Sequence, residues 1–386
     1  MTPLDVKLKV LVSEIVSVLN SVKGKEDKIV FLSTPDFSDN PFYVFKELYR
    51  LGEYELVWLM YSYNNDTASR FKEKYDVPIY PLLSIKGLQE VTSAKYVFIN
   101  DLLPLRPRRE QEIIQLWHGL PAKRTGFAHP FHIRDLYTFM NRWVSKFLTT
   151  GVLPMLAYIA QFRIDIDKFI ISTLPRLDGT LRPEKDAKRD LSRIGIDVES
   201  FDHVILYAPT YRYTSYVKEH TTSVDIIKQL YSEDFVQFLK DTNTLLVVKP
   251  HKIILGEIDN TEHIRVLSDK MLQEEFLTVN DVMNAFDILI TDYSSIFFDY
   301  LVLDKPIVFF VPDYDVAMRK SGFLFPYDKF TPGRKCFNTK ELVEELLNIL
   351  DKKDDFKLER QTIKQLVFEK EPVNNTVTLL NDLGVV

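Results

Sequence analysis

A histidine with the setting of a general base follows the apolar segment at residues 113–116. Gly119 lets the backbone turn sharply there and brings the side chain of His118 to the end of a predicted strand. A histidine in that position can accept a proton from a hydroxyl group near neutral pH. The alternative is a strand-end histidine that bonds only to the backbone. Lys123 and Arg124 follow closely and are either contacts for an anion or part of a solvated face.

Two further apolar segments end in side chains that suit a phosphate. After residues 203–208 come Thr210, which offers a hydroxyl group, and Arg212, whose planar charged fork matches phosphate oxygens. After residues 244–249, a proline fixes the backbone so that His251 projects from the end of the strand. Each of these residues, taken alone, fits an ordinary loop equally well.

A third junction of this kind lies between a predicted strand at residues 288–290 and a predicted helix at residues 296–303. Asp292, Ser294 and Ser295 lie here, where side-chain oxygens cap the first free N–H groups of a helix. The same N–H groups and the two hydroxyls make a site for a phosphate, and an ordinary capped helix is the other reading. Because several such groups all follow strands, we favour a joint functional site.

Metal chemistry has little support in the sequence. His129 and His132 have a spacing that allows a metal pair, but no acidic or cysteine ligands cluster with them, so we favour a loop or acceptor-side role. For the pair Asp165 and Asp167 we prefer a solvated turn. Cys336 is the single cysteine, which excludes an internal disulfide. The sequence also lacks the glycine-rich fingerprints of nucleotide-binding loops and the Gly-x-Ser-x-Gly elbow of hydrolases.

The composition is that of a soluble globular protein, with 46% hydrophobic and 27% charged residues among 386. The formal net charge of −6 argues against a general nucleic-acid-binding protein, since those are usually basic. No secretory signal is evident, and the longest mildly hydrophobic stretch, residues 147–162, is too short to span a bilayer. We therefore expect a cytoplasmic protein that could still touch a membrane surface.

Short apolar strands alternate with helices, which predicts an α/β fold with parallel, doubly wound sheets. The expected strands are residues 28–34, 55–61, 77–82, 95–100, 113–117, 145–150, 168–172, 203–208, 244–249, 264–267, 288–291 and 307–311. Expected helices include one that Asp39 or Asn40 caps, and others at residues 224–239, 279–286 and 339–350. This pattern and the chain length predict two Rossmann-like domains that face each other across a ligand cleft.

The predicted domain boundaries follow from the change in composition after the first set of strands. An N-terminal domain is expected at residues 1–180 and a charged linker at residues 181–200. A C-terminal domain is expected at residues 201–350, followed by a helical segment at residues 351–386 that packs back toward the N-terminal domain.

Four blocks of the sequence stand in the order found in a known family. They are Ser38-Asp39-Asn40-Pro41, Trp117-His118-Gly119-Leu120-Pro121-Ala122-Lys123, Tyr207-Ala208-Pro209-Thr210-Tyr211-Arg212 and residues 290–299, and the later Pro332-Gly333 adds to them. They resemble the CDP-glycerol glycerophosphotransferase family, the teichoic-acid primases and polymerases with the GT-B glycosyltransferase fold. Departures from the family pattern lie at Leu120, at residues 172–178 and at residues 249–252.

The resemblance implies a GT-B-like enzyme that moves glycerol phosphate from CDP-glycerol to a hydroxyl of a lipid-linked glycan or growing polymer. It would release CMP in the synthesis of teichoic acid or a capsule-like polymer. His118 would act as base on the acceptor hydroxyl, and His251 would stabilise charge on the leaving side. The donor would be bound by Thr210, Arg212, Asp292, Ser294, Ser295 and Asp299, and the acceptor by Asp39, Lys123 and Arg124.

The resemblance also bears on partners and location. No cofactor or metal is implied, and peripheral contact with the cytoplasmic face of the cell membrane is expected, with a homo-oligomer possible. Arg134 and Arg142 lie among aromatic residues and suit a headgroup surface, although a charged helix over a core fits them as well. The alternatives are a CDP-ribitol transferase, a nucleotide-sugar glycosyltransferase or epimerase of the same fold, and a binding protein without catalysis.

Overall fold

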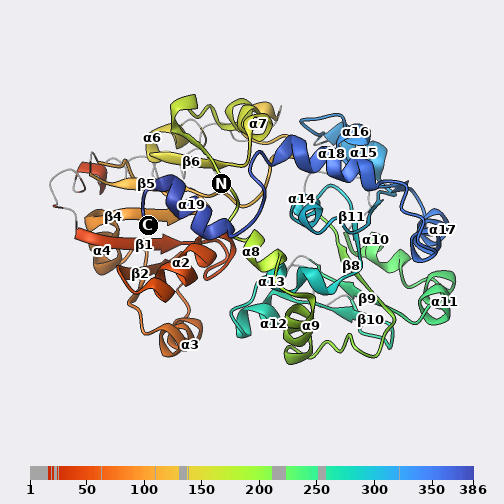
Figure 1. Ribbon diagram of the computed structural model, residues 1–386. Coiled ribbons are helices and arrows are strands. Elements are labelled where there is room, and N and C mark those ends of the chain that lie inside the picture. The colour runs from red at the N-terminus through yellow and green to blue at the C-terminus, as the bar shows by residue number, and fades with distance from the viewer. Residues whose placement is uncertain are drawn as a thin grey trace. The chain divides into compact units, whose positions relative to one another are not determined.

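The computed structural model describes residues 16–386 apart from residues 19, 21–23, 25, 62, 109, 130–136, 138, 211–222, 251–257 and 321. The chain forms two compact units (Figure 1). Unit 1 consists of Met1–Leu120, Thr125–Asp178 and Val367–Val386, and unit 2 of Pro121–Arg124 and Gly179–Leu366. Four residues that the sequence singled out, His132, Arg134, Arg212 and His251, lie outside the described residues.

Unit 1 is built on a sheet whose seven described strands are all parallel, in the order β3-β2-β1-β4-β5-β6-β7. They are β1 (Glu26–Leu32), β2 (Glu55–Met60), β3 (Ile79–Pro81), β4 (Ala94–Ile99), β5 (Glu112–Gln115), β6 (Lys146–Thr149) and β7 (Phe169–Ile171). Because parallel strands share one carboxyl edge, the loops that follow β1, β4, β5 and β7 can meet there.

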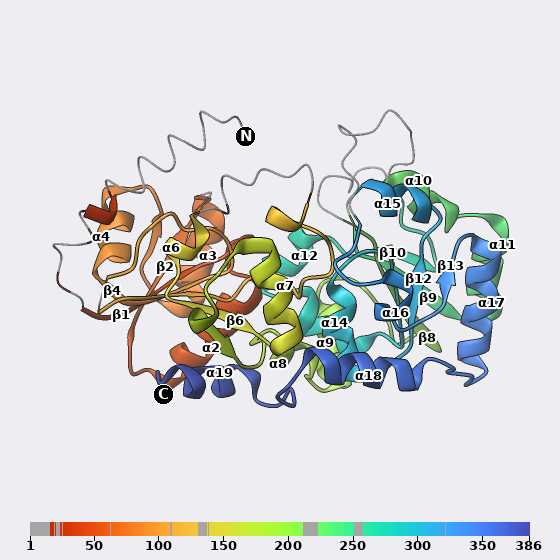
Figure 2. The ribbon, with the colours of Figure 1, turned by 90° about the horizontal axis from the view of Figure 1, so that it is seen from above.

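Helices cover this sheet and hold its loops. They are α2 (Asp39–Leu51), α3 (Asn65–Tyr75), α4 (Ile85–Ser93), η1 (Gly126–Ala128), α6 (Met140–Trp143), α7 (Val152–Phe162), η2 (Ile166–Lys168) and α19 (Asn375–Leu383), with α8 (Leu177–Thr180) at the boundary of the unit. Phe31 of β1 stacks between Trp58 and Phe98 and meets the ring of Phe45 on α2 edge-on. This aromatic core fixes the position of α2, and α19 packs against α2 (Figures 1 and 2).

Unit 2 contains a second parallel sheet, whose six described strands run in the order β10-β9-β8-β11-β12-β13. They are β8 (His203–Ala208), β9 (Thr244–Val248), β10 (Ile264–Val266), β11 (Ile288–Thr291), β12 (Ile307–Phe310) and β13 (Lys335–Cys336). β8 and β11 are neighbours at the centre of the sheet. The loops that carry Thr210 and Asp292 therefore start side by side.

The helices of unit 2 cover both faces of its sheet. They are α9 (Glu184–Arg193), α10 (Ser223–Gln229), α11 (Glu233–Asp241), α12 (Asp269–Glu274), α13 (Val279–Val282), η5 (Met283–Ala285), α14 (Ile296–Tyr300), η6 (Leu301–Leu303), α15 (Tyr314–Lys320), α16 (Tyr327–Phe330), α17 (Thr339–Leu350) and α18 (Lys357–Val367). Alternate residues of four strands, such as Ile205 and Tyr207 on β8, form one core with α10, α11 and α17.

All twelve predicted strands are confirmed, and β13 was not predicted. The prediction of a single helix at residues 224–239 is wrong, because the chain forms α10 and α11 with a break before Ser232, the N-cap of α11. The predicted cap of α2 is also wrong: Ser38 occupies the N-cap position and makes no side-chain cap bond. Within the part of the chain that the structure describes, no helix has the length and apolar composition needed to cross a bilayer.

The chain passes between the units before Pro121, after Arg124, after Asp178 and before Val367. Residues 181–200, expected as a linker, belong to unit 2 and contain α9, which packs against α13 and η5. Arg182 forms ion pairs there with Asp190 and Asp281. The last helices divide in the same way, since α18 belongs to unit 2 and α19 to unit 1.

Candidate functional site

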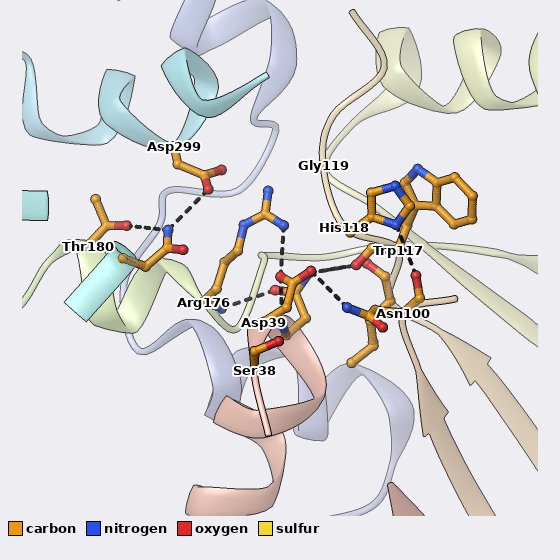
Figure 3. Close-up of polar contacts among 12 residues, drawn as sticks. Ser38, Asp39, Asn100, Trp117, His118, Gly119, Arg176, Thr180 and Asp299 are labelled. Atoms are coloured by element: carbon orange, nitrogen blue, oxygen red, sulfur yellow. Dashed lines mark hydrogen bonds and ion pairs between the residues drawn. The ribbon is translucent and has the colours of Figure 1, made fainter. Parts of the chain in front are cut away.

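His118 lies just after β5, with its ring exposed and stacked on Trp117 at a centroid distance of 4.3 Å. Trp117 has φ +51°, a left-handed conformation that is uncommon for a bulky residue and turns the chain at this point. Nδ1 of His118 lies 3.1 Å from the backbone carbonyl oxygen of Asn100 (Figure 3). A neutral imidazole therefore donates Nδ1–H to that carbonyl and keeps its lone pair on Nε2. Nε2 is then the atom that can take a proton.

Buried polar side chains hold the loop around His118. Asn40 donates from Nδ2 to the carbonyl oxygens of Leu116, at 3.3 Å, and Trp117, at 3.1 Å. The backbone N–H of Trp117 donates to Oε1 of Gln115 at 2.9 Å. Tyr158 donates its hydroxyl to the carbonyl of the glycine after His118 at 2.6 Å. The loop is thus fixed from several sides.

Asp39, predicted to contact the acceptor, has its carboxylate occupied by protein groups. Oδ1 accepts from Nη1 of Arg176 at 2.9 Å and from the backbone N–H of Asn40 at 2.8 Å. Oδ2 accepts from Nδ2 of Asn100 at 3.0 Å (Figure 3). The side chains of Asp39 and Arg176 are only 14% and 5% exposed. The prediction included neither Arg176 nor Asn100, although Arg176 lies in the segment where the chain departs from the family pattern.

Asp292, predicted to bind the donor, joins the ends of β8 and β11. Its residue is fully buried, and its carboxylate accepts the backbone N–H of Thr210 at 2.9 and 3.1 Å and that of Tyr293 at 2.5 Å. The hydroxyl of Tyr327 donates to the backbone carbonyl of Asp292 at 3.0 Å. Asp292 therefore fixes the loop that presents Thr210.

Lys123, predicted to contact the acceptor, lies in unit 2 beside Thr210, which was predicted to contact the donor. Residue Lys123 forms an antiparallel bridge with Phe323, and Nε of Arg124 donates to the carbonyl of Phe323 at 3.1 Å. From this bridge, Nζ of Lys123 donates to Oγ1 of Thr210 at 3.1 Å. The structure therefore brings an ammonium group to the carboxyl end of β8, while the exposed Arg124 belongs to the same segment.

The two serines after β11 are half-buried. Ser295 is the N-cap residue of α14 but makes no side-chain cap bond, and Oγ of Ser294 accepts from the N–H of Ile296 at the long distance of 3.4 Å. The expected capping is therefore weak. Two partly exposed hydroxyl groups follow the buried Asp292 at this strand end.

Asp299, predicted to meet a ribose, lies inside the unit. Its residue is 4% exposed, and Oδ2 accepts from Nδ2 of Asn280 at 3.1 Å (Figure 3). The same nitrogen of Asn280 donates to Oγ1 of Thr180 at 2.9 Å. A carboxylate that is so deeply buried offers little surface to a ligand, so these contacts point to a structural role.

The candidate metal pairs give no metal centre in the described part of the chain. No group of three or more histidine, cysteine or acidic residues suited to a metal ion occurs among the described residues. Asp165 accepts from Nδ2 of Asn141 at 2.6 Å, and Asp167 is exposed beside it. The solvated turn expected at this place agrees with these contacts.

Comparison with known proteins gives one family match over nearly the whole chain. The model of the family described as CDP-glycerol:poly(glycerophosphate) glycerophosphotransferase matches residues 15–382. The teichoic acid poly(glycerol phosphate) polymerase of Bacillus spizizenii is 26% identical over 90% of this chain and 91% of that protein. The teichoic acid glycerol-phosphate primase of Bacillus subtilis is 27% identical over 77% of this chain and 79% of that protein.

Other relatives are longer than this chain. The ribitol-phosphate polymerase TarL of Staphylococcus aureus is 26% identical over 76% of this chain but only 54% of its own length. Among solved structures, that of the wall teichoic acid polymerase TagF, H548A, has a TM-score of 0.76 at 20% identity and covers 100% of this chain and 98% of that one. At that identity the likeness concerns the fold alone, and it confirms the predicted α/β, GT-B-like architecture.

Proposed function

Because the chain belongs to the CDP-glycerol:poly(glycerophosphate) glycerophosphotransferase family, and is a transferase of that kind, we propose that it acts in teichoic acid synthesis with CDP-glycerol as its donor. The acceptor in this proposal is a hydroxyl of a lipid-linked glycan or of a growing glycerol-phosphate chain. The names of the polymerase and primase relatives support this assignment.

The observation that carries the proposal is the setting of His118. Its Nδ1 is directed to the carbonyl of Asn100, so that Nε2 is the basic atom. In the proposed reaction Nε2 takes the proton of the acceptor hydroxyl, and that oxygen forms a bond to the β-phosphorus of CDP-glycerol. The bond between this phosphorus and the bridging oxygen breaks, and CMP leaves with the electron pair. A positioned base of this kind contributes roughly 10² to 10⁴ in rate.

The donor phosphates are proposed to lie at the carboxyl ends of β8 and β11. Thr210, Ser294 and Ser295 offer hydroxyl groups there, and Lys123 supplies positive charge through its position beside Thr210. We therefore assign Lys123 to the donor rather than to the acceptor. Asp292 presents Thr210 to the ligand by accepting its backbone N–H. The family resemblance adds Arg212 and His251, which would stabilise the charge that develops on CMP.

The acceptor and the membrane form the next part of the proposal. We propose peripheral association with the cytoplasmic face of the membrane, where a lipid-linked acceptor is available. Basic and aromatic side chains of unit 1 support this: the exposed Arg142 lies 5.8 Å from the ring centroid of the partly exposed Phe139. Such side chains suit the boundary between headgroups and water. Arg124, which is exposed in unit 2, remains the proposed acceptor contact there.

CDP-ribitol is the second candidate donor. The observation that favours it is that a ribitol-phosphate polymerase and a glycerol-phosphate polymerase share the same 26% identity with this chain. The nucleotide part of the proposal is the same for both donors.

The deciding experiment offers CDP-glycerol, CDP-ribitol and UDP-sugars in parallel to the purified protein with a lipid-linked acceptor. We expect release of CMP from CDP-glycerol, and a fall of about 10² to 10⁴ in turnover on His118→Ala with donor binding retained. His263→Ala is the matched control, since Nδ1 of His263 also bonds to a backbone carbonyl, that of Thr244, at 2.9 Å. Release of UDP alone would refute the proposed donor, and full turnover of His118→Ala would refute the proposed base.

A further inference from the structure

A nearly buried ion pair in unit 1 is connected to His118 through a single residue. Arg176 and Asp39 pair at 2.9 Å, and the other oxygen of Asp39 accepts from the side chain of Asn100 at 3.0 Å. The backbone carbonyl of Asn100 is the group that accepts from Nδ1 of His118 at 3.1 Å (Figure 3). An unbroken chain of polar contacts therefore runs from Arg176 to the imidazole ring.

Asn100 is held on all sides in this chain of contacts. Its residue is fully buried at the end of β4. Its Oδ1 accepts from the backbone N–H of Thr34 at 2.8 Å, and its Nδ2 donates to the carbonyl of Thr34 at 3.3 Å as well as to Asp39. The side chain thus ties the end of β4 to the loop after β1, which fixes the carbonyl that His118 uses.

The neighbouring Asn40 holds the other side of the same loop. Its Oδ1 accepts from the backbone N–H of Arg176 at 3.1 Å, and its Nδ2 donates to the carbonyl of Trp117 at 3.1 Å. Asp39, just before it, has φ +58°, a left-handed conformation that costs a non-glycine residue free energy. This strained turn directs Asp39 to Asn100, whose carbonyl bonds to the ring of His118, and directs Asn40 to Trp117, the residue before His118.

An ion pair with so little exposure is a weak source of stability, because the cost of removing both charges from water offsets their attraction. A role in positioning accounts for the pair better. The same sheet offers a contrast in Lys28, whose Nζ lies 2.5 Å from Oε2 of Glu90. Lys28 lies near the amino end of β1, away from the carboxyl edge, and both side chains are 6% exposed. Lys28 and Glu90 make no contact with His118, so this pair serves below as a control for the pair of Asp39 and Arg176.

We propose that Asp39, Asn100 and Arg176 are positioning residues that hold His118 in its Nδ1–H tautomer and in one ring orientation. The inference rests on the proposed role of His118 as base. Asp39 then acts through His118 and does not bind the acceptor, consistent with the three N–H groups that its two oxygens already accept. A misplaced base loses rate rather than substrate affinity, so the loss falls on kcat.

The kinetic test is a cycle of Asp39→Asn and His118→Ala. Asp39→Asn alone is expected to lower kcat about 10²-fold and to change KM for either substrate less than about twofold. Added to His118→Ala, it is expected to leave the residual release of CMP unchanged, because the group that it positions is gone. A further loss of the same size in the double variant, or a raised KM for the acceptor, would overturn the inference.

Failures of the base and of its positioning give different results in this cycle. If His118→Ala keeps full turnover, the proposed base fails and the positioning role falls with it. If His118→Ala abolishes turnover while Asp39→Asn has no effect on kcat, only the positioning role falls. Glu90→Gln is the matched control, because it removes the acidic partner of a similarly buried pair and is expected to leave kcat of the folded enzyme unchanged. Arg176→Lys keeps the positive charge and is expected to lose less kcat than Arg176→Met.

Ring nitrogen NMR of the whole protein gives a readout that does not depend on turnover. The cross-peaks of His118 are those that vanish in His118→Ala, and the parent is expected to show the Nδ1–H tautomer. Asp39→Asn is expected to shift the population toward the Nε2–H tautomer, while Glu90→Gln leaves it unchanged. An unaltered tautomer in Asp39→Asn, together with unaltered kcat, would overturn the inference.

Discussion

Nζ of Lys123 donates to Oγ1 of Thr210 at 3.1 Å, although 87 positions of sequence separate the two residues. The block that carries His118 thus contributes to both units, since its first part belongs to unit 1 and residues from Pro121 to Arg124 belong to unit 2. Backbone bonds fix this second part, including that from Leu324 N–H to the carbonyl of Ala122 at 3.0 Å. A cation held in this way is a fixed part of the donor site that we propose at the carboxyl ends of β8 and β11.

Substitution of Lys123 by Met is predicted to lower the affinity of the protein for its donor, CDP-glycerol. Its ammonium group would no longer meet the phosphates, and a charge-assisted bond of this type contributes roughly 1.5 to 3 kcal/mol, or about 10- to 100-fold in Kd for CDP-glycerol. Calorimetric titration with CDP-glycerol measures the effect. The neighbouring Arg124→Met is the control, with donor affinity expected to be unchanged. If Lys123→Met raises KM for the acceptor and leaves donor affinity unchanged, Lys123 is part of the acceptor site instead.

Asp292→Asn is predicted to destabilise unit 2. Oδ1 of the fully buried carboxylate accepts the backbone N–H groups of Thr210 and Tyr293, and Oδ2 lies 3.1 Å from the backbone nitrogen of Thr210. In the amide, an NH2 group replaces Oδ2 and faces the N–H of Thr210, so that two buried donors meet. A buried donor left without a partner costs about 1 to 3 kcal/mol, which urea unfolding can measure. Thr210→Val keeps the backbone N–H and removes only the hydroxyl, so its free energy of unfolding should fall much less. Equal stability of the parent and Asp292→Asn would show that the carboxylate of Asp292 does not stabilise the loops of Thr210 and Tyr293.

The strands and the residues at their ends could be predicted from the sequence, because both depend on local patterns. Buried parallel strands read as short apolar runs, and functional side chains follow them at one edge of the sheet. His118 and Thr210 were proposed as site residues in this way, and the structure puts both in the loops that follow their predicted strands.

The hydrogen-bond partners of these residues could not be predicted from the sequence, because they come from distant parts of the chain. Asp39 meets Arg176 across 137 positions, and nothing in the local sequence of either residue specifies the other. The burial of two predicted donor contacts could not be inferred from the sequence either, because it also depends on distant parts of the chain. The fold encloses Asp292 and Asp299 in hydrogen bonds to the protein.

Glu90 is predicted to make stability depend on acid pH. Burial raises the pKa of its carboxyl, but hydrogen bonds from Lys28 and Lys86 outweigh burial and hold the pKa below its ordinary value of 4.5. The unfolded state therefore binds the proton more tightly, and the stability that Glu90 contributes is complete above pH 4.5 and is lost as the pH falls below it. Breaking the buried pair by Glu90→Gln should cost roughly 3 kcal/mol at pH 7.

Unfolding in urea between pH 3 and pH 7 measures this dependence. The free energy of unfolding of Glu90→Gln is expected to fall less steeply with acid than that of the parent, so that the two curves approach each other at low pH. The pair of Arg50 and Glu47, whose side chains are 67% and 19% exposed, supplies the control, because Glu47→Gln should change stability little. Parallel curves for the parent and Glu90→Gln would contradict the prediction.

Gly333 is predicted to be intolerant of any side chain. A Cβ atom there would lie 2.0 Å from the carbonyl oxygen of Ile307 and 3.2 Å from Cδ2 of Phe309, in the close approach that lets β13 pair with β12. Since the first of these atoms is backbone, the strands themselves must shift, and Gly333→Ala should cost roughly 2 to 4 kcal/mol. Thermal unfolding measures this loss against Gly24→Ala, where no atom lies within 4 Å of the added Cβ. An unchanged Tm for Gly333→Ala would mean that β13 is not held to β12 as closely as the structure has it.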